Sequence, residues 1–239
     1  MLERSRKRIL QSLSTDAIVL DIGGWAKPFP RADWVLDLFP YETRGAGGTD
    51  GEGPERFAAA TWIERDVCDR EPYPFADGQF DFVICSHTLE DVRDPLFVCA
   101  EMVRIAKAGY VEVPSRLEEQ AYGFQGPWVG WGHHRWLIDV GEDSIEFVHK
   151  HGVVHGREGD HFPPGFQAGL SAEERVQTLW WQESFDFRER IFVEPAELDA
   201  HLAGFVAREL QARGRPAPSA EDGRASRLAR RLGLRRASG

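Results

Sequence analysis

Three carboxylates and a glycine pair stand where apolar runs of this sequence end. The run 17–20 leads into Asp21, and Gly23 and Gly24 follow; Asp37 ends a second run and Asp66 a third. Uninterrupted apolar runs are typical of parallel strands covered on both faces. Glycines at a strand's carboxyl end allow a tight turn and the close approach of a ligand to the backbone. Ligands of open α/β sheets bind at that end, so we expect these side chains to meet there.

Three histidines could move a proton. His87 follows the apolar run 80–86, and His133 and His134 lie in a stretch rich in Gly and Trp. A neutral imidazole beside an acceptor can take its proton at physiological pH. Alternatively, His87 is satisfied by backbone, and the pair faces solvent on a hairpin. Four further histidines lack the spacing of a metal site, so we expect no metal: His149, His151, His155 and His161.

The elements that must position these residues alternate between strands and connections. We expect strands at 17–22, 34–38, 62–67, 80–86 and 110–114. Asp94 and Pro95 are a helix start, with apolar residues at helical spacing up to residue 107. A surface helix leaning on the sheet is predicted at 3–13, with Ile9, Leu10 and Leu13 on one side. The pattern favours an α/β fold with a mostly parallel sheet.

Beyond residue 115 the character of the chain changes. Residues 116–177 are interpreted as an insertion that carries substrate-binding elements, with a hairpin from 136–140 to 145–150. Residues 178–182 and 185–192 are predicted as two tightly joined antiparallel strands, and 195–213 as a helix. The domain is expected to span 1–213. Residues 214–239 are expected to be a basic, flexible tail, for which weak contact with an anionic membrane surface is a minority interpretation.

Composition excludes several classes of function. The net charge is -10, and the basic residues gather in the tail, so the body is acidic and nucleic acid is not expected as a partner. Three cysteines, an odd number without metal-type spacing, favour reduced thiols in a cytoplasm. No apolar run reaches membrane-spanning length. The glycine-rich stretch 43–56 has no Gly-Lys-Ser/Thr ending, which excludes a nucleoside triphosphatase.

Two stretches resemble a known family. Val19-Leu20-Asp21-Ile22-Gly23-Gly24 is similar to the first motif of class I S-adenosylmethionine-dependent methyltransferases. The stretch from Pro74 to Pro95, through Phe80-Asp81-Phe82-Val83-Ile84-Cys85-Ser86-His87, resembles the fourth-strand signature of the type 11 branch. The resemblance covers residues 15–115. It implies a Rossmann-like sheet with flanking helices and antiparallel strands near the C-terminal end.

The resemblance also implies which residues contact the cofactor, S-adenosylmethionine. The methionine half would meet Asp21, Gly23 and Gly24, with Ser86 and His87 near the reactive methyl. The ribose would meet Asp37, with Leu38 beside it, and the adenine would meet Asp66 and Val67. The sequence departs from the family after Gly24, where Trp25, Ala26 and a proline-rich loop replace the third glycine and the helix.

The resemblance predicts methyl transfer from S-adenosylmethionine. We expect O-methylation of a glycosyl or small hydroxylated acceptor, with His87, His134 or His133 as the base. One alternative is a catalytically silent methyltransferase-like binding module, which the altered glycine motif motivates. A nicotinamide-dependent oxidoreductase is less favoured, because Gly-x-Gly-x-x-Gly is missing after the first strand.

Overall fold

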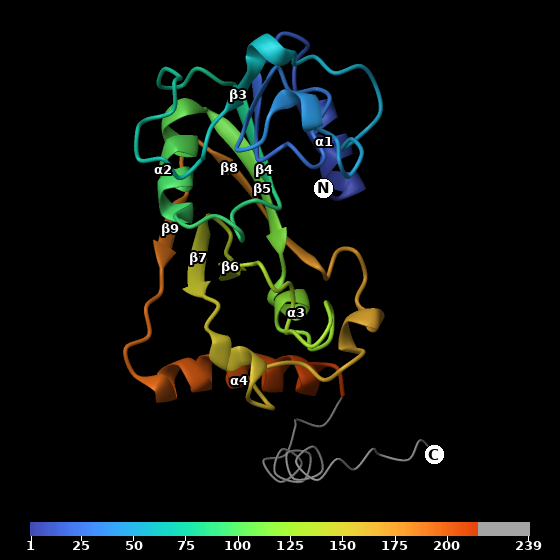
Figure 1. Ribbon diagram of the computed structural model, residues 1–239, viewed down its shortest axis with the longest axis vertical. Coiled ribbons are helices and arrows are strands. Elements are labelled where there is room, and N and C mark those ends of the chain that lie inside the picture. The colour runs from blue at the N-terminus through green and yellow to red at the C-terminus, as the bar shows by residue number, and fades with distance from the viewer. Residues whose placement is uncertain (215–239) are drawn as a thin grey trace. The chain divides into compact units, whose positions relative to one another are not determined.

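The computed structural model describes residues 1–214 (Figure 1). The tail predicted at 214–239 lies outside the described residues except for its first. The described chain divides into two compact units. The first unit comprises residues 1–116, 133–149 and 171–190, and the second comprises 117–132, 150–170 and, of the described residues, 191–214. The region interpreted as an insertion, 116–177, therefore contributes to both units.

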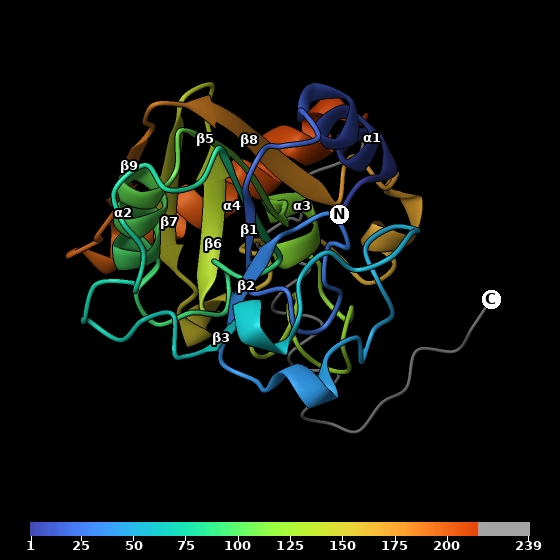
Figure 2. The same ribbon diagram turned by 90° about the horizontal axis from the view of Figure 1, so that it is seen from above.

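A six-stranded sheet organises the first unit. Its strand order is β3-β2-β1-β4-β5-β8. The strands are β1 (Val19–Ile22), β2 (Trp34–Asp37), β3 (Trp62–Glu64), β4 (Phe82–Ser86), β5 (Ala108–Pro114) and β8 (Val176–Gln182). The first five are parallel, and β8 pairs with β5 in the antiparallel direction. This confirms the predicted α/β class with a mostly parallel sheet; β1, β2 and β3 lie side by side in Figure 2.

Both faces of the central strand β1 are covered, as its apolar run predicted. Leu20 and Ile22 belong to one buried apolar cluster, together with Val98 and other residues of α2 (Pro95–Ile105). Val19 belongs to a second cluster, together with Ile9 of α1 (Glu3–Ser12). A strand that supplies apolar side chains to two cores cannot alternate apolar with polar residues.

The two predicted helices of this unit are confirmed, with one error of orientation. The Asp94 side chain accepts a hydrogen bond from the Phe97 N–H at 3.1 Å and caps α2 as predicted. In α1, Ile9 is fully buried but Leu10 is 48% exposed, so the two residues do not share one buried side of the helix as the prediction had grouped them. Ser5 takes the buried position one turn before Ile9, so the inward face of α1 is narrower than its apolar residues suggested.

A second sheet of three strands completes the first unit, in the order β6-β7-β9. The antiparallel strands β6 (Trp136–Val140) and β7 (Ser144–His149) form the predicted hairpin. The predicted pairing of 178–182 with 185–192 was wrong. The chain turns at Glu183, whose φ is 64°; β8 then pairs with β5, and β9 (Asp186–Glu189) pairs in parallel with β7.

The second unit has its own small core. The helix α4 (Pro195–Ala212) confirms the helix predicted at 195–213, and it buries Leu198, Leu202, Val206 and Leu210. Val206 and Leu210 pack in a cluster with Phe162 and Phe166, whose rings stack with centroids 3.9 Å apart. The short helix α3 (Arg116–Glu119) lies where the chain passes from the first unit to the second.

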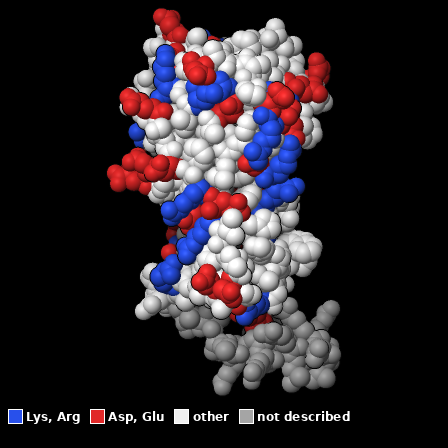
Figure 3. All heavy atoms as spheres, turned by 90° about the vertical axis from the view of Figure 1, so that its left-hand side faces the viewer, with Lys and Arg blue, Asp and Glu red and all other residues white. Residues whose placement is uncertain are grey.

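Among the described residues, no helix is both long enough and apolar enough to cross a bilayer. On the face drawn in Figure 3, acidic and basic side chains are intermixed over the described surface.

Candidate cofactor and active site

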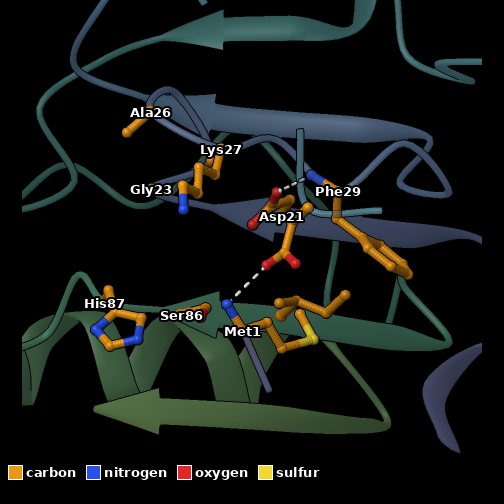
Figure 4. Close-up of a pocket in the computed structure, with 11 residues that line it drawn as sticks. Met1, Asp21, Gly23, Ala26, Lys27, Phe29, Ser86 and His87 are labelled. Atoms are coloured by element: carbon orange, nitrogen blue, oxygen red, sulfur yellow. Dashed lines mark hydrogen bonds and ion pairs between the residues drawn. The ribbon is translucent and has the colours of Figure 1, made fainter. Parts of the chain in front are cut away.

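A cavity of about 290 Å³ opens at the carboxyl ends of β1 and β4 (Figure 4). From β1 the chain continues to β2 and β3 on one side of the sheet, and from β4 it continues to β5 on the other side. Ligands of open α/β sheets bind at such a switch point. The cavity is lined by Met1, Asp21, Gly23, Gly24, Ala26, Lys27, Phe29, Asp50, Ile84, Ser86 and His87. Five of these are residues that the sequence predicted for the cofactor: Asp21, Gly23, Gly24, Ser86 and His87.

The glycine pair is required by space as well as by backbone conformation. Gly23 has a φ of 79°, and a Cβ there would lie 2.0 Å from the Thr88 Oγ1. A Cβ on Gly24 would lie 2.5 Å from the Asp21 Oδ2. The Gly23 N–H donates to the Leu36 carbonyl of β2 at 2.9 Å. The turn after β1 is therefore pressed against the loop after β4 and can hold only glycine without rearrangement.

Asp21 lies buried at the wall of the cavity. Its Oδ2 accepts a hydrogen bond from the Phe29 N–H at 2.9 Å, drawn as a dashed line in Figure 4. Burial raises the pKa of the Asp21 carboxyl to about 7, although this hydrogen bond opposes the rise. Asp21 thus fixes the proline-rich loop and keeps a carboxyl group that a bound cation would ionise.

Two carboxylates beside His87 favour its protonated form. Its φ of 54° places it in the left-handed region directly after β4. Its Nε2 is 3.2 Å from the Glu112 Oε1, and its Nδ1 is 3.4 Å from the Glu90 Oε1. Desolvation opposes protonation, but these two carboxylates outweigh it and raise the pKa of His87 to about 9. An imidazole that holds its proton this firmly is a poor base, so the geometry favours a fixed positive charge instead.

The partner of His87 is stabilised as an anion. Burial favours the neutral form of Glu112. Four neighbouring groups outweigh this effect and lower the pKa of Glu112 to about 2: His87, the Met1 ammonium, the Leu2 N–H and the Tyr110 hydroxyl. The Leu2 N–H donates to its Oε2 at 2.9 Å. Glu112 belongs to β5, next to β4 in the sheet. The charge of His87 therefore depends on a residue that the sequence analysis did not single out.

Several cavity residues were missed by sequence analysis. The Met1 ammonium lies 3.0 Å from the Asp50 Oδ2, and both residues line the cavity. Asp50 belongs to the glycine-rich stretch 43–56, and Lys27 and Phe29 belong to the proline-rich loop after Gly24. Loop residues of this kind have no periodicity from which their direction could be predicted. For Lys27, the one sequence feature that pointed to the cavity was its position three residues after Gly24.

Asp37 and Leu38 do not line this cavity. Both oxygens of Asp37 accept backbone hydrogen bonds at 2.9 Å, one from Trp25 and one from Phe39. Burial raises the pKa of Asp37 despite these hydrogen bonds. Its carboxylate therefore ties the loop after β1 to the end of β2. Leu38 and Phe39 are 56% and 46% exposed and leave apolar surface beside it.

Asp66 and Val67 lie outside the cavity as well. The Asp66 Oδ1 accepts a hydrogen bond from the Cys68 N–H at 2.8 Å, and its Oδ2 forms an ion pair with Arg93. Val67 is buried in the apolar core. The three strand-end carboxylates thus do not converge on this one cavity, since Asp37 and Asp66 hold local structure while Asp21 lines it.

His133 and His134 are brought together with a residue of the loop after β4 rather than with the cavity. The Nε2 atoms of both lie 3.8 Å from the Asp91 Oδ1. Within the described residues, Asp91, His133 and His134 form a group whose ligand atoms lie close enough to hold a metal ion. The four histidines between 149 and 161 do not belong to this group.

Comparison with known proteins supports the resemblance seen in the sequence. Residues 41–111, which contain β3, β4, α2 and the first half of β5, match the family model of the type 11 methyltransferase domain. The match is shorter than half of the chain. None of the curated proteins compared matches the chain.

Solved structures resemble the chain only at low similarity. An S-adenosylmethionine dependent methyltransferase from Mesorhizobium loti is 15% identical, with 72% of each chain covered and a TM-score of 0.35. One from Aquifex aeolicus is 16% identical over 52% of this chain and 73% of its own, with a TM-score of 0.32. A complex between the Haloferax volcanii Trm112 methyltransferase activator and the protein assigned as a methyltransferase gives 21% identity over 46% of this chain, with a TM-score of 0.34.

The chain spans 50% of the length of that last protein. At TM-scores this low, the fold rests on the strand order described above. The family match over residues 41–111 and the motif at the end of β1 agree, because both resemble a class I S-adenosylmethionine-dependent methyltransferase domain.

Proposed function

We propose that this chain transfers a methyl group from S-adenosylmethionine to a hydroxyl of a glycosyl or small hydroxylated acceptor. The observation that carries the proposal is the cavity at the switch point between β1 and β4, whose walls include the glycine pair and Asp21. Its volume of about 290 Å³ is at the lower end of ligand pockets. It suits the amino-acid half of the cofactor better than the whole molecule.

The polar groups of the cavity match the charges of that half. The Lys27 ammonium is a partner for a carboxylate, and Asp21 is a partner for an ammonium, whose binding would favour the ionised carboxyl. The Ser86 Oγ is buried and has no hydrogen-bond partner among the described residues. An orphaned polar atom beside a cavity favours a polar ligand, since leaving it unsatisfied is costly.

The adenosyl half would extend from the cavity toward the end of β2. Leu38 and Phe39 offer exposed apolar surface there, which suits the face of a purine. Asp37 would contact the ribose through the second acceptor position of either oxygen, since each oxygen accepts one backbone hydrogen bond. Asp66 and Val67 would stay near the adenine, as the resemblance implies.

The cofactor supplies an activated methyl group, because its sulfonium departs as a neutral thioether. The chain has to align the acceptor oxygen with that methyl carbon and exclude water. We assign His87 the role of a fixed positive charge at the cavity, and we place acceptor activation at His134 and His133. A cytoplasmic location is part of the proposal, which the three buried free thiols favour.

Calorimetric titration with S-adenosylmethionine tests the proposal. Lys27→Ala should weaken binding at least about tenfold, since it removes one charge-assisted contact worth roughly 1.5–3 kcal/mol. Lys107→Ala is the matched control, because Lys107 directly precedes β5 and pairs with Asp81. Equal affinity in both variants would remove Lys27 from the site. Transfer of labelled methyl to hydroxylated glycosides, and not to amines, is the expected acceptor class.

A silent binding module is a second candidate. It is favoured by the backbone hydrogen bonds of Asp37 and by the Arg93 ion pair of Asp66, since both carboxylates already hold local structure. The titration separates the two candidates, because a silent module would give no heat even at millimolar cofactor.

A further inference from the structure

Three side chains of the first unit meet in a way that methyl transfer does not by itself explain. Asp91 follows the turn after β4, whereas His133 and His134 precede β6. Both imidazole Nε2 atoms lie 3.8 Å from the Asp91 Oδ1, and the three ligand atoms all lie within 4.8 Å of one another. The centroids of the two rings are 4.6 Å apart.

The backbone fixes these two segments against each other on both sides of the group. The Arg135 N–H donates to the Glu90 carbonyl at 2.7 Å, and the Trp136 indole N–H donates to the Val92 carbonyl at 2.8 Å. Asp91 stands between the two acceptors, and the histidines stand immediately before the two donors. Such preorganisation is typical of a built site rather than of mobile surface side chains.

The Asp91 Oδ1 has a further property that points to a ligand. Among the described residues this oxygen is buried and has no hydrogen-bond partner. The separation of 3.8 Å from each Nε2 is too long for a hydrogen bond. With metal–ligand bonds of about 2.0–2.2 Å, two donors on one ion are roughly 3.0–3.5 Å apart. The two Asp91–histidine distances would have to shorten by a few tenths of an ångström, and the distance between the two imidazole nitrogens by up to about 1–2 Å, which small side-chain rotations supply.

We propose that Asp91, His133 and His134 bind a divalent transition-metal ion of the Zn²⁺ class. Imidazole nitrogens and one carboxylate suit Zn²⁺, Co²⁺ and Fe²⁺ better than Mg²⁺ or Ca²⁺, which prefer oxygen ligands. Three protein ligands leave at least one coordination position open, which is typical of a catalytic rather than a structural site. The open position takes water or an oxygen donor.

The site has the mixed exposure that such a role needs. The His134 side chain is 7% exposed and anchors the group, whereas Asp91 and His133 are 42% and 58% exposed. An ion held there would be reached from solvent. Its use in activating an acceptor hydroxyl rests on the proposed function, but binding of the ion does not.

Metal titration of the untagged full-length chain tests the inference. The protein is stripped with a chelator and dialysed, and Co²⁺ is added while the visible d–d absorption is followed; Zn²⁺ is then added as a competitor. We expect one ion per chain, with Zn²⁺ displacing Co²⁺. Asp91→Asn and His133→Ala should each weaken the affinity at least tenfold. His151→Ala is the matched control and should leave it unchanged.

Circular dichroism shows whether each variant is folded. A third ligand variant, His134→Ala, changes the buried member of the group; if it does not fold, the Asp91→Asn and His133→Ala variants decide the test. Absence of Co²⁺ absorption at about 100 µM ion would overturn the inference. Equal affinity of Asp91→Asn and the wild type would overturn it too, since the ion would then lie elsewhere. Calorimetry with S-adenosylmethionine is independent of this readout, so failure of either proposal is recognised separately.

Discussion

Replacing Gly23 with alanine tests how tightly the turn after β1 is packed. A Cβ at this position would lie 2.0 Å from the Thr88 Oγ1, 2.6 Å from its Cγ2 and 2.8 Å from its Cβ. Real Cβ atoms essentially never approach below 3.0 Å. The backbone φ of 79° adds strain to any L-residue with a side chain.

The expected cost follows from these two terms. The left-handed backbone contributes about 1–2 kcal/mol, and overpacking against Thr88 contributes about 1–3 kcal/mol. Gly23→Ala should thus lower the free energy of unfolding by about 2–5 kcal/mol. For a chain of this size the melting temperature should fall by about 4–20 °C. Because Gly23 lines the cavity, cofactor affinity should fall as well.

Thermal unfolding followed by circular dichroism measures the effect, with Gly78→Ala as the matched control. Gly78 has a φ of 62°, but a Cβ at this position would meet no other atom within 4 Å. This control therefore reports the backbone term alone, about 1–2 kcal/mol. Thr88→Ala removes two of the three close atoms, so the Gly23→Ala/Thr88→Ala double variant should be more stable than the sum of the single effects predicts.

Equal destabilisation by Gly23→Ala and Gly78→Ala would refute the packing argument. Strict additivity in the double variant would do the same, because it would show that the new methyl group does not meet Thr88.

Three further predictions concern the charged residues. In an NMR titration the His87 imidazole should show a pKa of about 9, and Glu112→Gln should lower it by removing the stronger partner; titration near the usual 6.5 would contradict the geometry. The stabilising contribution of His87 is complete below about pH 6.5 and lost as the pH rises through 9. For Asp21, whose folded-state pKa of about 7 exceeds its usual 3.8, ionisation destabilises the fold between those values, so stability should fall as the pH rises through that window. Asp21→Asn should flatten this slope in denaturant unfolding, and an unchanged slope would assign it to another group. Asp37→Ala should weaken S-adenosylmethionine binding at least several-fold in calorimetry, through contact or through loss of the Trp25 hydrogen bond, and unchanged affinity would remove it from the site.

The strands could be predicted because their information is local. The run 17–20 is apolar on both faces, and this indicates a central parallel strand. Asp94 and Pro95 likewise mark the start of α2 by local chemistry. The orientation of Leu10 was not predictable in this way, since it depends on which face of α1 meets the sheet.

Strand pairing required information from distant residues. The segments 178–182 and 185–192 are close in sequence and have hairpin-like composition, yet β8 joins β5 and β9 joins β7. The turn at Glu183, a non-glycine residue with positive φ, carried no sequence signal. The pairing partner of each strand therefore depends on contacts between residues that are distant in the sequence.

The positions of several site residues were predictable from the sequence, but their protonation and their contact partners were not. The motif after β1 placed Asp21, Gly23 and Gly24 at the cavity. It did not predict that His87 is charged, because Glu112 is 25 residues away. Nor did it predict that Asp91 meets His133 and His134, which lie more than 40 residues further along the chain.

Calorimetric titration of the full-length chain with S-adenosylmethionine tests the central claim most directly. We predict one binding site per chain, with an affinity that Lys27→Ala weakens and Lys107→Ala does not. Absence of heat at millimolar cofactor would contradict the account and leave the fold without the proposed activity.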